Sequence, residues 1–141
     1  TGSRTPMQWD DSLHHGFSTA DSSLLYLPTD GREGAPTVEA QQRRQDSLYH
    51  MVKELLQVRR GQDAFARHDN LEILCAEKGK RSFAYRRDNL VMVCNPSGEE
   101  ETLSLNVAGA ARLFAVGSAE PAGEACVLGA QSFAVFVKGQ A

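Results

Sequence analysis

Apolar residues recur at every second position in the second half of this chain. The pattern is clearest at Leu103, Leu105 and Val107, and it returns over residues 133–137. Successive side chains of a β-strand point to opposite faces, so this period predicts half-buried strands. Seven such stretches follow residue 70: 71–77, 81–87, 89–95, 101–107, 111–117, 124–129 and 131–138.

Short runs of turn-forming residues separate these stretches. They read "KGK", "DN", "NPSGEE", "AGA" and "EPAGE". Gly, Pro, Asn, Asp and Ser favour turns for known conformational reasons. Short strands joined in this way predict an antiparallel β-sandwich, with its core between two sheets.

A helical pattern precedes the strands. An amphipathic helix is predicted over residues 47–60, with Asp46 or Ser47 as its N-cap and Gly61 after its end. A shorter helical piece is expected over residues 38–44. The apolar side of the longer helix consists of Leu48, Met51, Val52, Leu55, Leu56 and Val58.

The first 45 residues are rich in Gly, Pro, Ser, Thr and Asp. Their apolar residues follow neither the helical period nor the period of two that is typical of strands. A loop this long is uncommon in a compact domain unless it is functional or supported by another surface. Because large exposed apolar patches are rare, the loop is expected to pack on the sandwich or against a second copy of the chain. We favour the second copy, which would give a homodimer. The apolar loop residues are Met7, Trp9, Phe17, Leu24, Leu25, Tyr26 and Leu27.

Composition excludes several classes of partner. The chain has 141 residues, of which 41% are apolar, and a net charge of -3, so nothing favours a nucleic acid or an acidic membrane surface. No apolar run approaches the roughly 20 residues that span a bilayer. The three cysteines lack metal-site spacing, and we interpret them as buried thiols in a reducing cytoplasm.

The chain contains no phosphate-binding glycine loop, no G-x-S-x-G and no H-E-x-x-H motif. The pair His14 and His15 could bind a metal or act in acid–base chemistry, but adjacent histidines before a glycine favour a solvated turn. The pair His68 and Asp69 could mimic a catalytic dyad, but its position before a strand favours a turn. No metal site and no cofactor are predicted.

Two further candidates lie in the opening stretch. Asp10 and Asp11 could be paired carboxylates for glycoside hydrolysis, but neighbours in sequence usually point apart, so capping or turn formation is the better interpretation. Trp9 could stack on a sugar, or it could be a buried anchor of the loop, which we favour.

The order "SRTPMQWDDS", "GFS", "YLP" and "SLYHMVKELLQVRR" resembles the C-terminal part of the α-glucosidase branch of the α-amylase superfamily, glycoside hydrolase family 13. This branch includes oligo-1,6-glucosidases, dextran glucosidases and trehalose synthases. The resemblance is dense over residues 3–60, and "FAYRR" and "LVMVCNPSGEE" extend it. It implies that residues 1–60 are the last loop and helix of a (β/α)8 barrel and that residues 61–141 are a C-terminal β-sandwich domain.

The resemblance also implies which catalytic groups are missing. Family members retain anomeric configuration with an aspartate nucleophile, a glutamate acid/base and a second aspartate. These residues lie on earlier barrel strands and have no counterpart here, because His68 and Asp69 follow the "RTPMQWD" run instead of preceding it. The expectation is a C-terminal fragment of a cytoplasmic α-glucosidase that acts on short α-glucosides, inactive by itself.

By motif, Arg4 resembles the arginine that forms a side wall of the glucose pocket, pairing with an upstream aspartate and contacting sugar hydroxyls. The alternative is that Arg4 only holds its loop. At His14 and His15 the chain departs from the family, which often has Asn-Ala there.

Two other functions remain open for the sandwich. It could be a stand-alone carbohydrate-binding or protein-interaction module, or it could only stabilise the barrel. A groove with two or more exposed aromatic rings would favour the module. The aromatic residues of this region are Phe65, Phe83, Tyr85, Phe114, Phe133 and Phe136.

Overall fold

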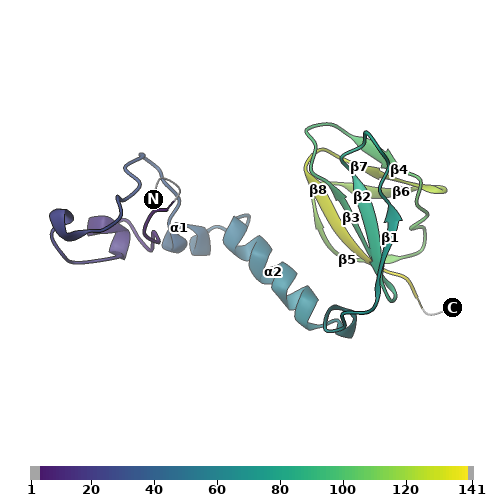
Figure 1. Cartoon of the computed structure of the whole chain (residues 1–141), viewed down its shortest axis with the longest axis horizontal. Helices are drawn as coiled ribbons and strands as arrows, with labels where there is room; N and C mark the ends of the chain where they lie inside the picture. Colours follow the sequence, from purple (N-terminus) through teal and green to yellow (C-terminus); the bar gives the residue numbers. More distant parts are fainter. Residues whose placement is uncertain (1–3, 140–141) are drawn as a thin grey trace. The chain divides into compact units, whose positions relative to one another are not determined.

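The computed structural model describes residues 4–139, which fold as two compact units (Figure 1). The first unit ends at Glu54 and the second begins at Leu55. Helix α2 (Leu48–Arg60) therefore begins in one unit and ends in the other. No helix among the described residues has the length and apolar character that crossing a membrane requires.

The first unit consists mainly of loop. It holds two short 3-10 helices, η1 (Leu13–Gly16) and η2 (Ser22–Leu24), followed by α1 (Val38–Arg43). Thr37 is buried and caps α1, because its hydroxyl oxygen accepts a hydrogen bond from the amide of Ala40 at 3.2 Å. The helix predicted over residues 38–44 is confirmed.

Helix α2 confirms the predicted helix over residues 47–60 within one residue. Of the two candidate caps, Ser47 has its hydroxyl oxygen 3.5 Å from the amide of His50. The carboxylate of Asp46 pairs with Arg44 instead, at 3.1 Å. Ser47 is therefore the residue placed to cap the first turn.

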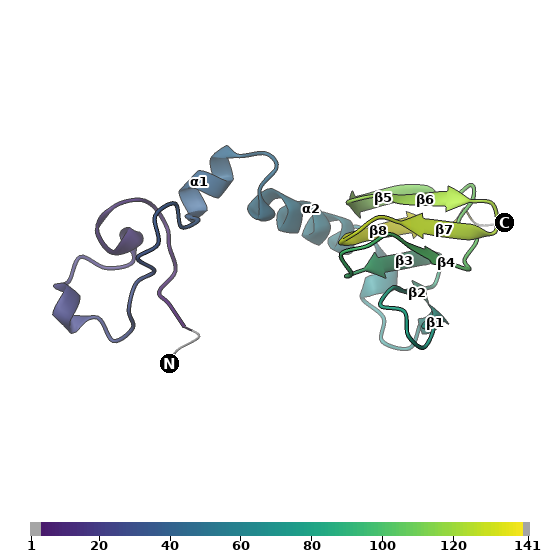
Figure 2. The same ribbon diagram turned by 90° about the horizontal axis from the view of Figure 1, so that it is seen from above.

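The second unit is an antiparallel arrangement of eight strands in two sheets, preceded by η3 (Asp63–Phe65). The strand orders are β1-β2-β3-β8-β5 and β4-β7-β6, as Figure 1 and Figure 2 show. The predicted fold class is confirmed. The strands are β1 (Leu71–Cys75), β2 (Phe83–Arg87), β3 (Leu90–Asn95), β4 (Glu101–Leu103), β5 (Ala111–Val116), β6 (Ala119–Ala122), β7 (Ala125–Leu128) and β8 (Ser132–Val137).

Strand β6 corrects the predicted strand count. It includes the first part of "EPAGE", a segment that the sequence pattern predicts to be a turn. Residues 119–122 pair with β7. Pro121 is tolerated there since β6 is an edge strand, and a proline lacks the amide that a central strand needs. The actual turn is shorter and includes Gly123, whose φ of 63° suits a glycine.

Strand β4 is shorter than the predicted 101–107. The amide of Leu105 donates to the carbonyl oxygen of Leu103 at 2.9 Å, and this tight turn ends the strand. The alternation still predicts which side chains enter the core, since Leu103 and Val107 are both fully buried.

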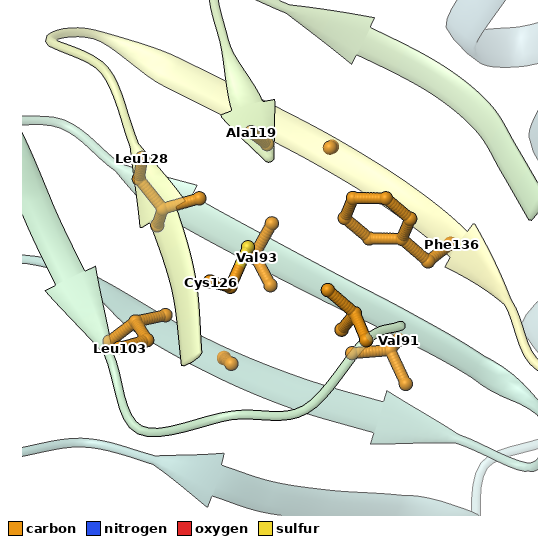
Figure 3. Close-up of a cluster of buried hydrophobic side chains, with 10 residues drawn as sticks. Val91, Val93, Leu103, Ala119, Cys126, Leu128 and Phe136 are labelled. Carbon is orange, nitrogen blue, oxygen red and sulfur yellow. The ribbon is translucent and has the colours of Figure 1, made fainter. Parts of the chain in front are cut away.

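The core lies between the sheets, where Val91 and Val93 of β3 meet Leu103, Cys126 and Leu128 (Figure 3). The central strands β3 and β8 are buried on both faces. In β8, Ala134 and Phe136 belong to the inter-sheet core, and Val135 on the opposite face is equally buried.

Candidate functional site

The "RTPMQWD" run is fixed by its backbone to the start of helix α1. The carbonyl oxygens of Gln8 and Trp9 accept hydrogen bonds from the amides of Val38 and Glu39, both at 2.9 Å. The first amides of a helix have no partner within the helix, so they are free to hold an incoming segment. The start of α1 thereby sets the position of the run.

A left-handed turn follows the run. His14 and His15 both have φ of 53°, and Gly16 has φ of 69°. The carbonyl oxygen of His15 accepts from the amide of Trp9 at 2.8 Å and lies 3.4 Å from that of Asp10. Each non-glycine residue in this conformation costs about 1–2 kcal/mol, so other contacts must stabilise the turn.

Gly16 is required by a close approach as well as by its φ. A Cβ atom at this position would lie 2.6 Å from a carboxylate oxygen of Asp10. Any other residue would therefore require the Asp10 carboxylate to shift.

The rings of both histidines contribute to the stabilisation of the turn. Nε2 of His14 lies 3.0 Å from the carbonyl oxygen of Ala20, and Nε2 of His15 lies 3.0 Å from that of Asp30. A carbonyl oxygen only accepts, so each Nε2 carries the proton and donates. The predicted turn is confirmed, but the rings are half-buried and hydrogen-bonded, not solvated.

Asp10 has a turn role, as predicted, instead of belonging to a catalytic pair. Its Oδ1 accepts from the amide of Ser12 at 2.8 Å and from the Ser12 hydroxyl. The hydroxyl bond lowers the pKa of Asp10. Asp11 is exposed, and within residues 4–139 no cluster of His, Cys, Asp and Glu has a metal-binding arrangement.

Asp30 organises the segment that leads back to the run. Nε of Arg32 donates to both of its carboxylate oxygens, at 2.9 and 3.0 Å. These bonds, with a smaller contribution from the Gln8 side chain, lower the pKa of Asp30 to about 2. Asp30 is therefore ionised and lies beside the run.

A pocket of about 480 Å³ lies between the run, the Asp30 segment and the start of α1. Pro6, at its edge, is one of the few buried residues of the first unit. The polar groups of the pocket come from Thr5, Gln8, Asp30, Arg32, Thr37 and Gln41.

Arg4 immediately precedes the first residue that lines this pocket. Its side chain is exposed, and no ion pair between residues of the described range 4–139 includes it. The upstream aspartate expected to pair with Arg4 has no equivalent in this chain. A role for Arg4 in sugar binding stays a prediction.

The predicted burial of Trp9 is wrong for this chain. The side chain is 50% exposed, although its backbone is fixed at both the amide and the carbonyl. Its surroundings supply no apolar cover, because the first unit buries almost no side chains. Other exposed apolar residues of this unit are Met7, Leu13, Phe17, Leu24, Tyr26, Leu48, Tyr49 and Val52.

The sandwich offers few groups for chemistry. His68 and Asp69 are exposed in a bend, where Asp69 pairs with Arg67 at 3.3 Å, in agreement with the turn interpretation.

The three cysteines are free, and burial raises the pKa of each thiol, which disfavours the nucleophilic thiolate. Only Cys126 is fully buried, whereas Cys75 and Cys94 are partly exposed.

Among the described residues of the sandwich, Phe83 is the one exposed aromatic ring, whereas Phe65, Tyr85 and Phe133 are partly buried and line one pocket, so the two exposed rings expected of a sugar-binding module are not found. Phe83 is 39% exposed and stacks beside Tyr85, whereas Phe114 and Phe136 are buried. A second pocket of about 360 Å³, lined by Leu55, Phe65 and Tyr85 among others, is predominantly apolar. Leu71 and Ile73 at its side are 51% and 59% exposed.

Comparison with known proteins finds several that are similar to this chain. Residues 1–68 match the α-amylase catalytic domain family. The chain is 32% identical over 111 residues to a glucan 1,6-α-glucosidase of Streptococcus dysgalactiae, an alignment that covers 76% of this chain and 20% of that protein. It is 45% identical over 69 residues to a trehalose synthase/amylase of Mycobacterium tuberculosis, covering 46% of this chain and 12% of that protein.

A solved structure shares the fold of this chain. The trehalulose synthase of Pseudomonas mesoacidophila superposes with a TM-score of 0.79 at 21% identity, over 95% of this chain and 25% of that structure. This chain thus spans about a fifth of the length of the first curated relatives and a quarter of that structure. The chain belongs to the α-amylase superfamily, glycoside hydrolase family 13, in the branch of the α-glucosidases and trehalose synthases.

Proposed function

We propose that this chain is the C-terminal part of a retaining, cytoplasmic α-glucosidase that acts on short α-glucosides. Its role is to frame the sugar pocket and to stabilise the catalytic barrel. One observation carries this proposal: the "RTPMQWD" run is fixed by its backbone to α1 and lines a polar pocket from Thr5 onward, directly after the exposed Arg4. The names of the relatives, glucan 1,6-α-glucosidase among them, support the substrate class.

Arg4 is proposed to bind sugar hydroxyls together with a carboxylate from the barrel. A guanidinium group supplies five donors in a fixed plane and keeps its charge at every working pH. Its exposure and the absence of a competing ion pair among residues 4–139 leave these donors free for such a role.

The nearby carboxylates do not suit catalysis. A general acid in glycoside hydrolysis needs a raised pKa so that it holds its proton until the bond breaks. The pKa values of Asp10 and Asp30 are lowered, by Ser12 and Arg32 respectively. The family's three carboxylates would come from earlier barrel strands, so this chain alone is proposed to be inactive.

The uncovered apolar surfaces support a structural role against a larger body. Leu48, Val52 and Leu56 recur at every fourth position of α2, and each is exposed by 44% or more. Residues at this spacing form one stripe of a helix, which normally packs against a neighbour. We place the boundary between the barrel part, residues 1–60, and the sandwich domain, residues 61–141, at the end of this helix.

For the isolated chain, the same surfaces favour a second proposal, pairing with another copy. A stripe on α2 together with the exposed Met7, Trp9 and Phe17 is a large apolar area for a monomer to leave in water. Exchange or pairing of identical segments is a low-cost route to a homodimer.

The coding region directly upstream of residue 1 tests the main proposal. An in-frame barrel that carries an aspartate nucleophile, a glutamate acid/base and a second aspartate is expected. The 141-residue chain alone should not hydrolyse a chromogenic α-glucoside. Turnover by a preparation free of host enzymes, or an upstream region without a barrel, would contradict the proposal.

The role of Arg4 is tested in that whole enzyme. Arg4→Ala should lower kcat/KM by about 10- to 100-fold, because it removes hydrogen bonds from a charged donor. Arg4→Lys should not restore it, since a point charge lacks the fork of donors. Arg44→Ala removes an exposed arginine outside the pocket and should have no effect. Unchanged kinetics of Arg4→Ala would mean that Arg4 only holds its loop.

A further inference from the structure

His15 connects two segments that are far apart in the sequence. Its backbone carbonyl oxygen accepts a hydrogen bond from the amide of Trp9 at 2.8 Å. Its ring lies 3.0 Å, at Nε2, from the carbonyl oxygen of Asp30, fifteen residues later. One residue thus holds the "RTPMQWD" run on one side and the Asp30 segment on the other.

The run and the Asp30 segment also lie together at the pocket. The Asp30 carboxylate accepts hydrogen bonds from Arg32, and the side chain of Gln8, which directly precedes Trp9, makes a small contribution to lowering its pKa. Gln8, Asp30 and Arg32 all line the 480 Å³ pocket. The hydrogen bonds between Trp9 and His15 and between His15 and Asp30 therefore connect the run to the Asp30 segment beside that pocket.

The ring can make this connection in only one way. The carbonyl of Asp30 requires a donor, so the proton must be on Nε2. Nδ1 of His15 is buried and has no hydrogen-bond partner within the described residues. The ring is thus held through Nε2 alone, and the two ring nitrogens have distinct roles.

We infer that His15 is a positioning residue that sets the wall of the sugar pocket through its Nε2–H bond to Asp30. The left-handed backbone of His15 brings the ring to this carbonyl, and the bond offsets the strain of that conformation. That the pocket binds sugar rests on the proposed function. Its geometry can be tested without any sugar.

Two amide substitutions separate the ring bond from the backbone conformation. In His15→Gln, the side-chain amide nitrogen can take the place of Nε2. In His15→Asn, it takes the place of Nδ1 and cannot reach Asp30. Asparagine, however, adopts the left-handed conformation more readily than glutamine. A residue needed only for its backbone would therefore favour Asn, whereas the inferred bond favours Gln.

The readout is hydrogen exchange of the Trp9 and Glu39 amides in the full chain, followed by NMR. His15→Asn and His15→Ala should speed exchange by a factor on the order of ten, the effect of losing about one hydrogen bond. His15→Gln should stay within about threefold of the unmodified chain. The ring of the unmodified chain should show a protonated Nε2 in its nitrogen spectrum.

Matched substitutions at His14 provide the control. Its ring donates to Ala20, within the same loop, so His14→Gln and His14→Asn should leave the Glu39 amide unchanged. Three results would each overturn the inference: slow exchange retained in His15→Asn but lost in His15→Gln, an Nε2 without a proton, or an unprotected Trp9 amide in the unmodified chain. None of these results depends on sugar binding, so they are distinct from a failure of the proposed function.

Discussion

The side-chain amide nitrogen of Asn95 lies 2.9 Å from the carbonyl oxygen of Gly129, which joins the end of β3 to the turn after β7. The same nitrogen donates to the carbonyl of Glu99 at 2.8 Å. Oδ1 accepts from the amide and the hydroxyl of Ser97, at 3.0 and 2.7 Å. Asn95 is fully buried, so its amide ties two turns together with its hydrogen-bonding capacity satisfied.

Asn95→Ala should lower the free energy of unfolding by about 3 kcal/mol, because it leaves several buried groups without partners. Urea denaturation of the 141-residue chain measures this change. Asn89→Ala, at an exposed turn position, should cost less than about 0.5 kcal/mol. Equal losses in the two variants would show that the buried network contributes nothing.

The stability of the sandwich should decline in acid through Glu101. The hydroxyl and amide of Ser82 donate to its carboxylate and lower the pKa of Glu101 below its ordinary value of 4.5. A lowered folded-state pKa stabilises the fold above the unfolded-state pKa, and this contribution is lost as the pH falls through the folded-state value. The decline should therefore lie below pH 4.5.

Urea midpoints measured across this range test the Glu101 prediction. Glu101→Gln should be less stable at neutral pH and should show a flatter dependence on acid than the unmodified chain. Glu100→Gln changes the exposed neighbour and should keep the original dependence. A profile of Glu101→Gln that runs parallel to that of the unmodified chain would count against the role of Ser82.

Cys126 should react with a thiol reagent only when the sandwich opens. The side chain is fully buried in the inter-sheet core, and burial raises the pKa of its thiol. At neutral pH its modification should be slower than in urea by a factor on the order of one hundred or more. Mass spectrometry of digested samples measures each site, and Cys75, which is partly exposed, serves as the internal comparison. Equal rates at the two cysteines in the native chain would be the contrary result.

Self-association of the isolated chain should depend on the apolar stripe of α2. Sedimentation at micromolar concentration should show a dimer, and Val52→Lys should shift it towards monomer because a charge would enter the contact. Lys53→Ala, on the same helix, should not. A monomeric unmodified chain would refute the dimer.

The strands and helices could be predicted where local pattern and packing agree. The alternation at Leu103 and Val107 predicts buried positions, and both are buried although β4 ends between them. Strand β6 could not be predicted, because Pro121 and Gly123 favour a turn locally. Its strand conformation comes from pairing with β7, which the local composition does not predict.

The candidate site could be predicted only as a motif. The "RTPMQWD" run indicates the family. The ring of His15, however, contacts a carbonyl oxygen fifteen residues later, and a local sequence pattern cannot predict a contact between residues so far apart. Burial of Trp9, the interpretation favoured from the sequence, needs apolar neighbours, and the first unit leaves its side chain 50% exposed. The parts that could not be predicted depend on contacts between residues that are distant in the sequence.

Pro121 leaves β6, one outer strand of the three-stranded sheet, one amide short, and each of the other outer strands is either irregular or short. β1 and β5 have register shifts, between Ile73 and Cys75 and between Arg112 and Phe114, and β4 has only three residues. An incoming chain that tried to extend either sheet would meet a gap in the ladder. The sandwich is therefore a poor template for fibril growth, even with apolar side chains in water nearby.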